Sequence, residues 1–148
     1  MARPSDFVNA DRLWARHMAI AQHGKTGNGG VNRQALTDDD RAARAELADW
    51  AHSRGFEVLI DEAANMFIRR EGWEQGAPVV LSGSHLDTQP AGGNFDGVYG
   101  VLAAFEVLEA LEDAGMKTRR PVEAVVWTNE EGCRFAPGCT GSMVFAGV

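Results

Sequence analysis

Residues 79–88 read Val79-Val80-Leu81-Ser82-Gly83-Ser84-His85-Leu86-Asp87-Thr88, an apolar run followed by a polar segment. The first half of this stretch is a short apolar run that ends at Gly83, which is typical of a buried strand. Its second half is polar and places a histidine and an aspartate two positions apart. Because α/β proteins place their sites where parallel strands end, the stretch predicts a strand followed by a functional loop.

Helical and extended patterns alternate on both sides of this stretch. Apolar residues at helical spacing predict helices over 6–22, 38–54 and 97–114, and β-type runs predict strands over 56–60, 66–69 and 122–128. Thr37 is expected to cap the second helix and Gly55 to end it. This order of elements indicates an α/β fold, with a mixed or mostly parallel sheet flanked by helices.

The third helix shows the clearest separation of polar from apolar residues. Its apolar positions form one face, and its acidic residues are expected to face solvent: Glu106, Glu109, Glu112 and Asp113.

Length and composition bound the possible functions. The chain has 148 residues, enough for one domain, and its net charge of -7 comes without a stripe of Lys or Arg, which argues against nucleic acid as a partner. No apolar run is long enough for a membrane span or a signal peptide. Cys133 and Cys139 form no disulfide framework or zinc-site pattern, so we expect reduced thiols in a cytoplasmic protein.

Potential metal ligands follow the predicted strands or precede the third helix. His85 and Asp87 follow one strand, Asp96 lies directly before the helix, and Glu130 and Glu131 follow the last strand. Imidazole and carboxylate groups suit zinc and similar divalent ions. Asp87 could accept the second imidazole N–H of His85, and Asp96 could bridge two ions.

Each of these residues also has a simpler interpretation. His85 and Asp87 could be a surface pair, Asp96 a helix N-cap, and Glu130 with Glu131 a solvated turn. Their joint occurrence at strand-to-loop junctions, set among glycines, favours the metal site. Adjacent glutamates on an extended segment point in opposite directions, so one as ligand and the other as general base is a natural division.

Three long motifs in order resemble the hydantoinase/carbamoylase amidases. These are Gly83-Ser84-His85-Leu86-Asp87-Thr88, Gly92-Gly93-Asn94-Phe95-Asp96-Gly97 and Thr128-Asn129-Glu130-Glu131-Gly132-Cys133-Arg134-Phe135. Shorter matches extend the resemblance over nearly the whole chain: Gly29-Gly30-Val31-Asn32-Arg33, Leu36-Thr37 and Gly141-Ser142. The family includes N-carbamoyl-L-amino-acid hydrolases, β-ureidopropionases and allantoate amidohydrolases, which are relatives of the di-zinc aminopeptidases.

The resemblance implies an aminopeptidase-like (phosphorylase/hydrolase-like) catalytic domain and a role for each matched residue. His85 would bind one divalent metal ion, Asp96 would bridge two, and Glu131 would bind the second. Glu130 would be the general base, and Asp87 would support His85. The ions would be zinc, or manganese, cobalt or nickel. The family reaction is hydrolysis of a linear amide or ureido C–N bond in a small molecule.

The resemblance also implies that residues 1–148 are the N-terminal part of the catalytic domain. Relatives carry two further histidine ligands, a lid and dimerisation domain and the rest of the catalytic domain beyond this point, so we expect a fragment that is inactive alone. His17, His23 and His52 match none of these ligands and are expected at the surface. N-carbamoyl-L-amino acids are the expected substrates. An allantoate amidohydrolase, a dipeptidase-like enzyme and a non-catalytic fragment remain alternatives.

Overall fold

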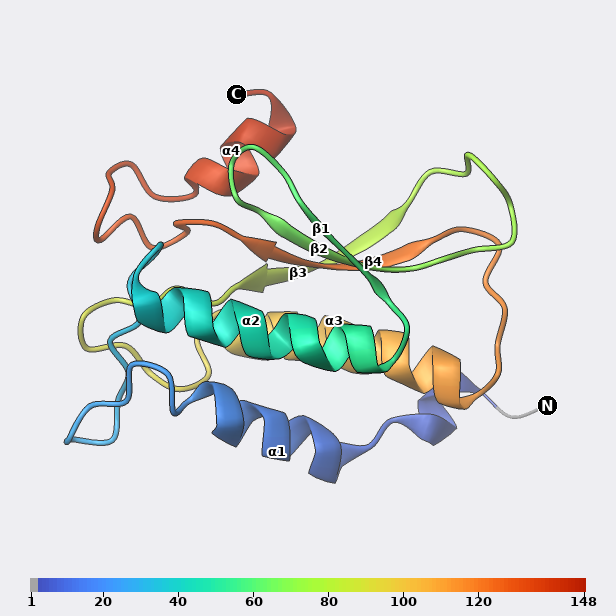
Figure 1. The fold of residues 1–148 in the computed structure, drawn as a ribbon, viewed down its shortest axis with the longest axis horizontal. Helices are drawn as coiled ribbons and strands as arrows, with labels where there is room; N and C mark the ends of the chain where they lie inside the picture. The colour runs from blue at the N-terminus through green and yellow to red at the C-terminus, as the bar shows by residue number, and fades with distance from the viewer. Residues whose placement is uncertain (1–2) are drawn as a thin grey trace.

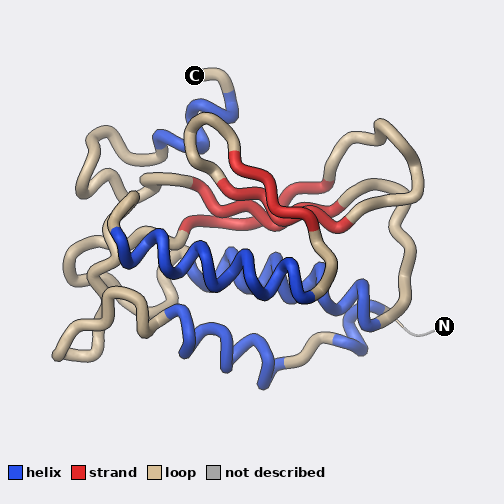
Figure 2. The backbone as a smooth tube through the Cα atoms, viewed as in Figure 1, coloured by secondary structure: helices blue, strands red, loops and turns tan. Residues whose placement is uncertain are grey.

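The computed structural model describes residues 3–148. In chain order the elements are a 3-10 helix η1 (Pro4–Phe7), α1 (Ala10–Ile20), α2 (Asp38–Ser53), β1 (Glu57–Ile60), β2 (Met66–Arg70), β3 (Val80–His85), α3 (Val98–Asp113), β4 (Val122–Trp127) and α4 (Thr140–Ala146). Two helices, α2 and α3, lie against one face of a sheet, with α1 on their outer side against α3 and the short α4 beside the other face (Figure 1; Figure 2).

The four strands form a mixed sheet in the order β1-β2-β4-β3. β1 pairs with β2 and β2 pairs with β4 in antiparallel fashion, whereas β3 and β4 are parallel and align His85 with Trp127. The α/β class and the mixed sheet are therefore confirmed, but a mostly parallel sheet is not. One parallel pair is sufficient to bring the loops after β3 and β4 to the same edge.

The core lies between the sheet and the helices α2 and α3. Leu102, Phe105 and Leu108 of α3 are buried against the sheet, and Leu47 of α2 joins the same cluster. Burying each such side chain contributes about 1.5–3 kcal/mol, which explains why α3 lies across β3 and β4. No helix within residues 3–148 combines the length and apolar character that crossing a membrane requires.

The N-terminal segment differs from its prediction. The single helix expected over 6–22 is η1 followed by α1, because Asn9 starts a new helix by accepting a hydrogen bond from the Arg12 N–H. The Asn9 N–H donates to the Glu106 carboxylate at 2.8 Å, which anchors this break to α3. A local cap therefore overrides the helical periodicity. By contrast, Thr37 caps α2 and Gly55 follows its end, as predicted.

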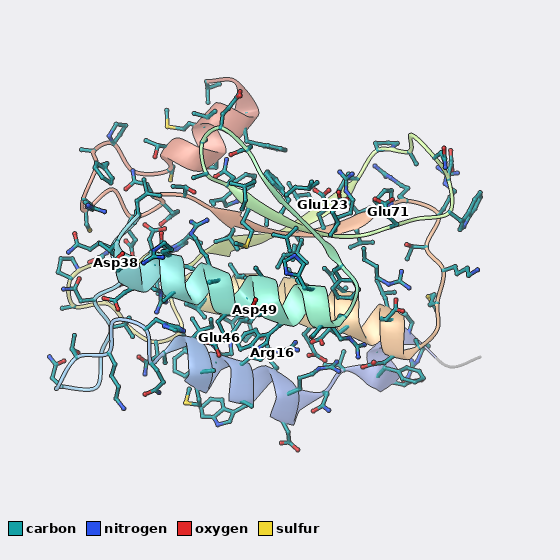
Figure 3. All side chains as sticks on the ribbon, viewed as in Figure 1. Arg16, Asp38, Glu46, Asp49, Glu71 and Glu123 are labelled. Carbon is teal, nitrogen blue, oxygen red and sulfur yellow. The ribbon has the colours of Figure 1, made fainter. Side chains whose placement is uncertain are left out.

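The acidic face of α3 was predicted to face solvent, and for two of its four residues this was wrong. Glu106 is 3% exposed and Glu109 is 1% exposed. Arg12 and Arg16 extend from α1 to these carboxylates, and Arg54 reaches Glu109 from the end of α2. Figure 3 shows Arg16 between α1 and the other helices. Buried carboxylates are tolerated here because guanidinium groups neutralise them.

Two further differences concern the sheet. β3 was expected to be buried on both faces, but Val80 is 46% exposed because β3 is an edge strand. The helix α4 was not predicted from its seven residues. Its Phe145 ring packs against Phe67 and Trp127 at centroid distances of 5.8 and 5.1 Å, so contacts with the sheet determine its position.

His17 was expected at the surface and is instead 2% exposed. Its ring stacks on Tyr99 with a centroid distance of 5.8 Å and lies 5.4 Å from the ring of Phe95. The error arose because a histidine on α1 faces α3, and helix spacing alone does not reveal which helix covers which face. The other two histidines fit the prediction better, since His52 is exposed and His23 is partly exposed.

Candidate functional site

His85 occupies the end of β3, where the loops after β3 and β4 meet. Its side chain is 7% exposed. Gly97, the N-cap of α3, packs directly against the imidazole: a Cβ atom at this position would lie 2.5 Å from the ring atoms Cε1 and Nε2. The same glycine has a φ of +66°, a conformation that side chains disfavour. The imidazole therefore fits in this position only because residue 97 has no side chain.

The hydrogen bonds of His85 define the role of each ring nitrogen. Nδ1 lies 2.8 Å from the backbone carbonyl of Asp87, and because a carbonyl can only accept, Nδ1 donates. In the neutral imidazole the lone pair therefore belongs to Nε2. That atom lies 3.3 Å from Oε2 of Glu130. The hydrogen bond from Nδ1 to a carbonyl thus leaves Nε2 as the unprotonated nitrogen, which is the tautomer that a histidine binding metal through Nε2 requires.

The Asp87 carboxylate joins the two loops. It is 1% exposed and accepts hydrogen bonds from the N–H groups of Glu130 and Glu131 at 3.3 and 3.2 Å. Burial raises the pKa of Asp87, while these N–H groups and His85 act in the opposite direction. The carboxylate was predicted to accept the imidazole N–H. Instead the backbone carbonyl of Asp87 accepts this N–H. The carboxylate oxygen Oδ1 of Asp87 lies farther away, 3.6 Å from Nδ1.

Glu130 and Glu131 have different neighbours. The Glu130 carboxylate faces His85 and lies 3.7 Å from the Cys139 thiol, whereas Glu131 accepts a hydrogen bond from Gln89 at 3.0 Å. Burial, with the charge of Glu130, raises the pKa of the Cys139 thiol, which keeps it protonated as a donor. Both cysteines are free thiols. The two glutamates were expected on an extended segment, whereas residues 128–131 form bends after β4, so their different neighbours follow from the turn.

Asp96 is exposed and lies in the turn directly before α3. The N-cap is Gly97 rather than Asp96, so the alternative role of Asp96 as a capping residue does not apply. Its connection to the other site residues is indirect, through Gly97 against the His85 ring. Within residues 3–148, no three His, Cys, Asp or Glu side chains are grouped closely enough to hold one metal ion. The assignment of His85, Asp96 and Glu131 as metal ligands stays a prediction.

Comparison with known proteins identifies the family to which this chain is similar. An N-carbamoyl-L-amino-acid amidohydrolase from Rhizobium meliloti is 47% identical over 150 residues, which cover 100% of this chain and 36% of that enzyme. The crystal structure of a hydantoinase/carbamoylase family amidase from Burkholderia multivorans superposes with a TM-score of 0.94 at 50% identity, covering 97% of this chain and 35% of that one. The chain belongs to the hydantoinase/carbamoylase amidase family.

Further matches agree with membership of this amidase family. Residues 81–147 match peptidase family M20/M25/M40. The N-carbamoyl-L-amino acid amidohydrolase from Geobacillus stearothermophilus is 42% identical over 141 residues, which are 95% of this chain and 34% of that enzyme. The chain thus spans about a third of the length of the relatives it matches. Its fold is part of the M20 aminopeptidase-like catalytic domain.

M20 enzymes typically depend on two metal ions, and the residues of this chain fit a divalent cation in chemical type. The fit rests on Nε2 of His85. With its proton on Nδ1, the neutral ring carries its lone pair on Nε2, 3.3 Å from the Glu130 carboxylate, and two acceptors this close favour a cation beside them. His85, Asp96 and Glu131 would hold the ions.

Several residues around the candidate site were not identified from the sequence. Gln89 contacts Glu131 and Cys139 contacts Glu130, but neither residue type stands out beside the acidic motifs. Arg33 was noted only as part of an N-terminal motif, yet its guanidinium reaches the Leu86 carbonyl between His85 and Asp87. A lone arginine within a polar segment gives no signal that it is buried.

Proposed function

We propose that this chain supplies part of the active site of a metal-dependent amidohydrolase that cleaves linear ureido C–N bonds, with N-carbamoyl-L-amino acids as substrates. The observation that carries the proposal is the 3.3 Å approach of Nε2 of His85 to the carboxylate of Glu130. This approach places an imidazole nitrogen, a common metal ligand, beside a carboxylate that can accept and return a proton. The names of the Rhizobium and Geobacillus relatives support the substrate class.

When bound, divalent ions would polarise the substrate carbonyl and lower the pKa of a water molecule. His85, Asp96 and Glu131 would hold the ions through their side chains. Glu130 would accept a proton from the attacking water and return it to the leaving nitrogen. Asp87 would hold the main chain of Glu130 and Glu131 in place through its two hydrogen bonds.

The chemistry of a carbamoyl group then sets the products. Cleavage of the ureido C–N bond leaves the free amino acid and a carbamate, which decomposes to ammonia and carbon dioxide. The proton taken by Glu130 ends on the amino nitrogen, so the residue returns to its starting state. One carboxylate can therefore serve as base and then as acid in each cycle.

The test is hydrolysis by the full-length protein, assayed with an N-carbamoyl-L-amino acid, allantoate and a dipeptide, each with metal and with a chelator. Turnover of the carbamoyl substrate should require metal. Glu130→Gln should lower kcat by a factor of about 10²–10⁴ while the metal content stays unchanged. The matched control is Glu112→Gln, because Glu112 is an exposed glutamate on α3.

Three results would contradict the proposal. Turnover that survives the chelator would exclude metal-dependent hydrolysis, and full activity of Glu130→Gln would exclude Glu130 as the base. Faster hydrolysis of allantoate or of the dipeptide would reject the substrate class and leave the amidohydrolase chemistry in place.

A further inference from the structure

Arg33 is an arginine with no exposed surface, and its hydrogen bonds go to backbone carbonyls. Its Nε donates to Leu86 at 2.8 Å, and Nη1 donates to Ile20 and His23 at 3.0 and 2.8 Å. Ile20 and His23 lie at the end of α1, whereas Leu86 directly follows β3. The guanidinium thus joins the end of a helix to the loop that carries His85.

The main chain of Arg33 contacts the same loop. Its N–H donates to Oγ1 of Thr88 at 2.8 Å, and its carbonyl accepts from the Thr88 N–H at 2.7 Å. Together with the side-chain bond to Leu86, these contacts hold the loop after His85 on both sides of Asp87. The position of this loop is therefore coupled to Arg33 through several hydrogen bonds.

Arg44 contacts the end of the neighbouring strand in a similar way. It is 9% exposed, and Nη2 lies 3.4 Å from the Trp127 carbonyl and 3.3 Å from Oγ1 of Thr128. Nη1 donates to the Ala64 carbonyl at 3.0 Å, which belongs to the turn between β1 and β2. Arg44 therefore contacts the last residue of β4, Trp127, and the next residue, Thr128, which is two residues before Glu130.

Arg44 is paired with a buried carboxylate, that of Asp40. Asp40 has no exposed surface, and its carboxylate accepts from Nε of Arg44 at 3.1 Å and from the Leu36 N–H at 2.9 Å. Burial lowers the pKa of Arg33, and the carboxylates of Asp40, Asp39 and Asp87 oppose this effect. The pairing of Arg44 with Asp40 limits the free-energy penalty of burying those two charges.

From these contacts we propose that Arg33 and Arg44 are positioning residues that fix the ends of β3 and β4, and so His85 and Glu130, relative to each other. The apolar core already joins the sheet to α3, but it places no directional bond at these two strand ends. A guanidinium can donate several hydrogen bonds in a fixed plane, and lysine cannot reproduce this geometry. The catalytic consequence rests on the proposed function, whereas the structural coupling does not.

The test is amide hydrogen exchange in the full chain, because the Glu130 and Glu131 N–H groups donate to Asp87 across the two loops. Arg33→Lys and Arg44→Lys should each raise the exchange rate of these two amides relative to the unaltered chain. The increase should be at least about tenfold greater than any increase at the core amides of α3. The control is Arg41→Lys, because Arg41 lies on α2 with its side chain 81% exposed.

A second variant keeps every buried charged group, in case the lysine variants do not fold. Thr128→Val deletes the hydroxyl that accepts from Arg44 and donates to the Ala64 carbonyl, and it should accelerate exchange at Glu130 and Glu131 in the same direction, by a smaller factor. If the site amides change only in proportion to the α3 amides in every folded variant, the two arginines merely stabilise the fold and the proposal is wrong. Since exchange needs no turnover, an inactive enzyme would leave this result unaffected.

Discussion

Nε2 of His85 lies 3.3 Å from Oε2 of Glu130, and the two residues stand at the ends of neighbouring parallel strands. The Asp87 carbonyl accepts the hydrogen bond from Nδ1, so in the neutral ring the lone pair is on Nε2, the nitrogen near the carboxylate. Two hydrogen-bond acceptors at this distance repel each other unless a proton or a metal ion compensates them. The arrangement therefore makes His85 the first residue to examine for metal binding.

We expect Zn²⁺ added to the 148-residue chain to perturb the His85 ring first in an NMR titration. Binding should be weak, because within residues 3–148 no three ligands are grouped around one ion. His85→Gln should abolish the effect, and His52→Gln should leave it intact because His52 is exposed at the end of α2. Saturable binding that persists in His85→Gln would exclude His85 as a ligand.

Gly97→Ala should lower the free energy of unfolding more than an equivalent change at the other end of α3. A left-handed backbone costs an alanine about 1–2 kcal/mol, and contact of the new Cβ with the His85 ring adds about 1–3 kcal/mol of overpacking. The control is Gly115→Ala, where φ is +59° but no atom lies within 4 Å of the position that the new methyl group would take. Urea unfolding of the two variants measures the difference, and equal losses would contradict the predicted clash.

Glu109→Ala should lower the free energy of unfolding by about 3–5 kcal/mol, because it leaves buried guanidinium groups without their anion. Glu109 is 1% exposed and lies between Arg12, Arg16 and Arg54. Glu71→Ala is the comparison, since Glu71 is 65% exposed at the side chain and its removal should change stability by at most about 0.5 kcal/mol. Similar urea midpoints for both variants would mean that the arginines find other partners.

Stability should fall with acid partly because of His17. Burial lowers the pKa of His17 from its usual 6.5, so below that pH the unfolded chain takes up a proton that the folded chain does not bind. The folded state therefore loses stability as the pH falls from about 6.5 toward the lowered pKa, by at most about 1.4 kcal/mol per pH unit. His17→Phe should flatten this slope in urea unfolding at pH values of about 7.5, 6.5 and 5.5. An unchanged slope would contradict the assignment.

Local signals in the sequence determined much of the fold and the location of the site. Thr37 and Gly55 bounded α2 because capping involves groups a few positions apart in the chain. The runs that became β3 and β4 placed His85 and Glu130 directly after strands, and parallel pairing then brought them together. These inferences needed only neighbouring residues and one general rule about sheets.

The tertiary structure alone decided which polar groups are buried and what they contact. Glu109 and His17 lie under neighbouring helices because α1 crosses α3, a relation that the periodicity of either helix does not contain. The Asp87 carboxylate binds the next loop while its carbonyl binds His85, and a spacing of two residues fits either contact. Burial and hydrogen-bond partners depend on surfaces that meet only after the chain has folded, so the sequence supplied the candidates and the packing assigned their partners.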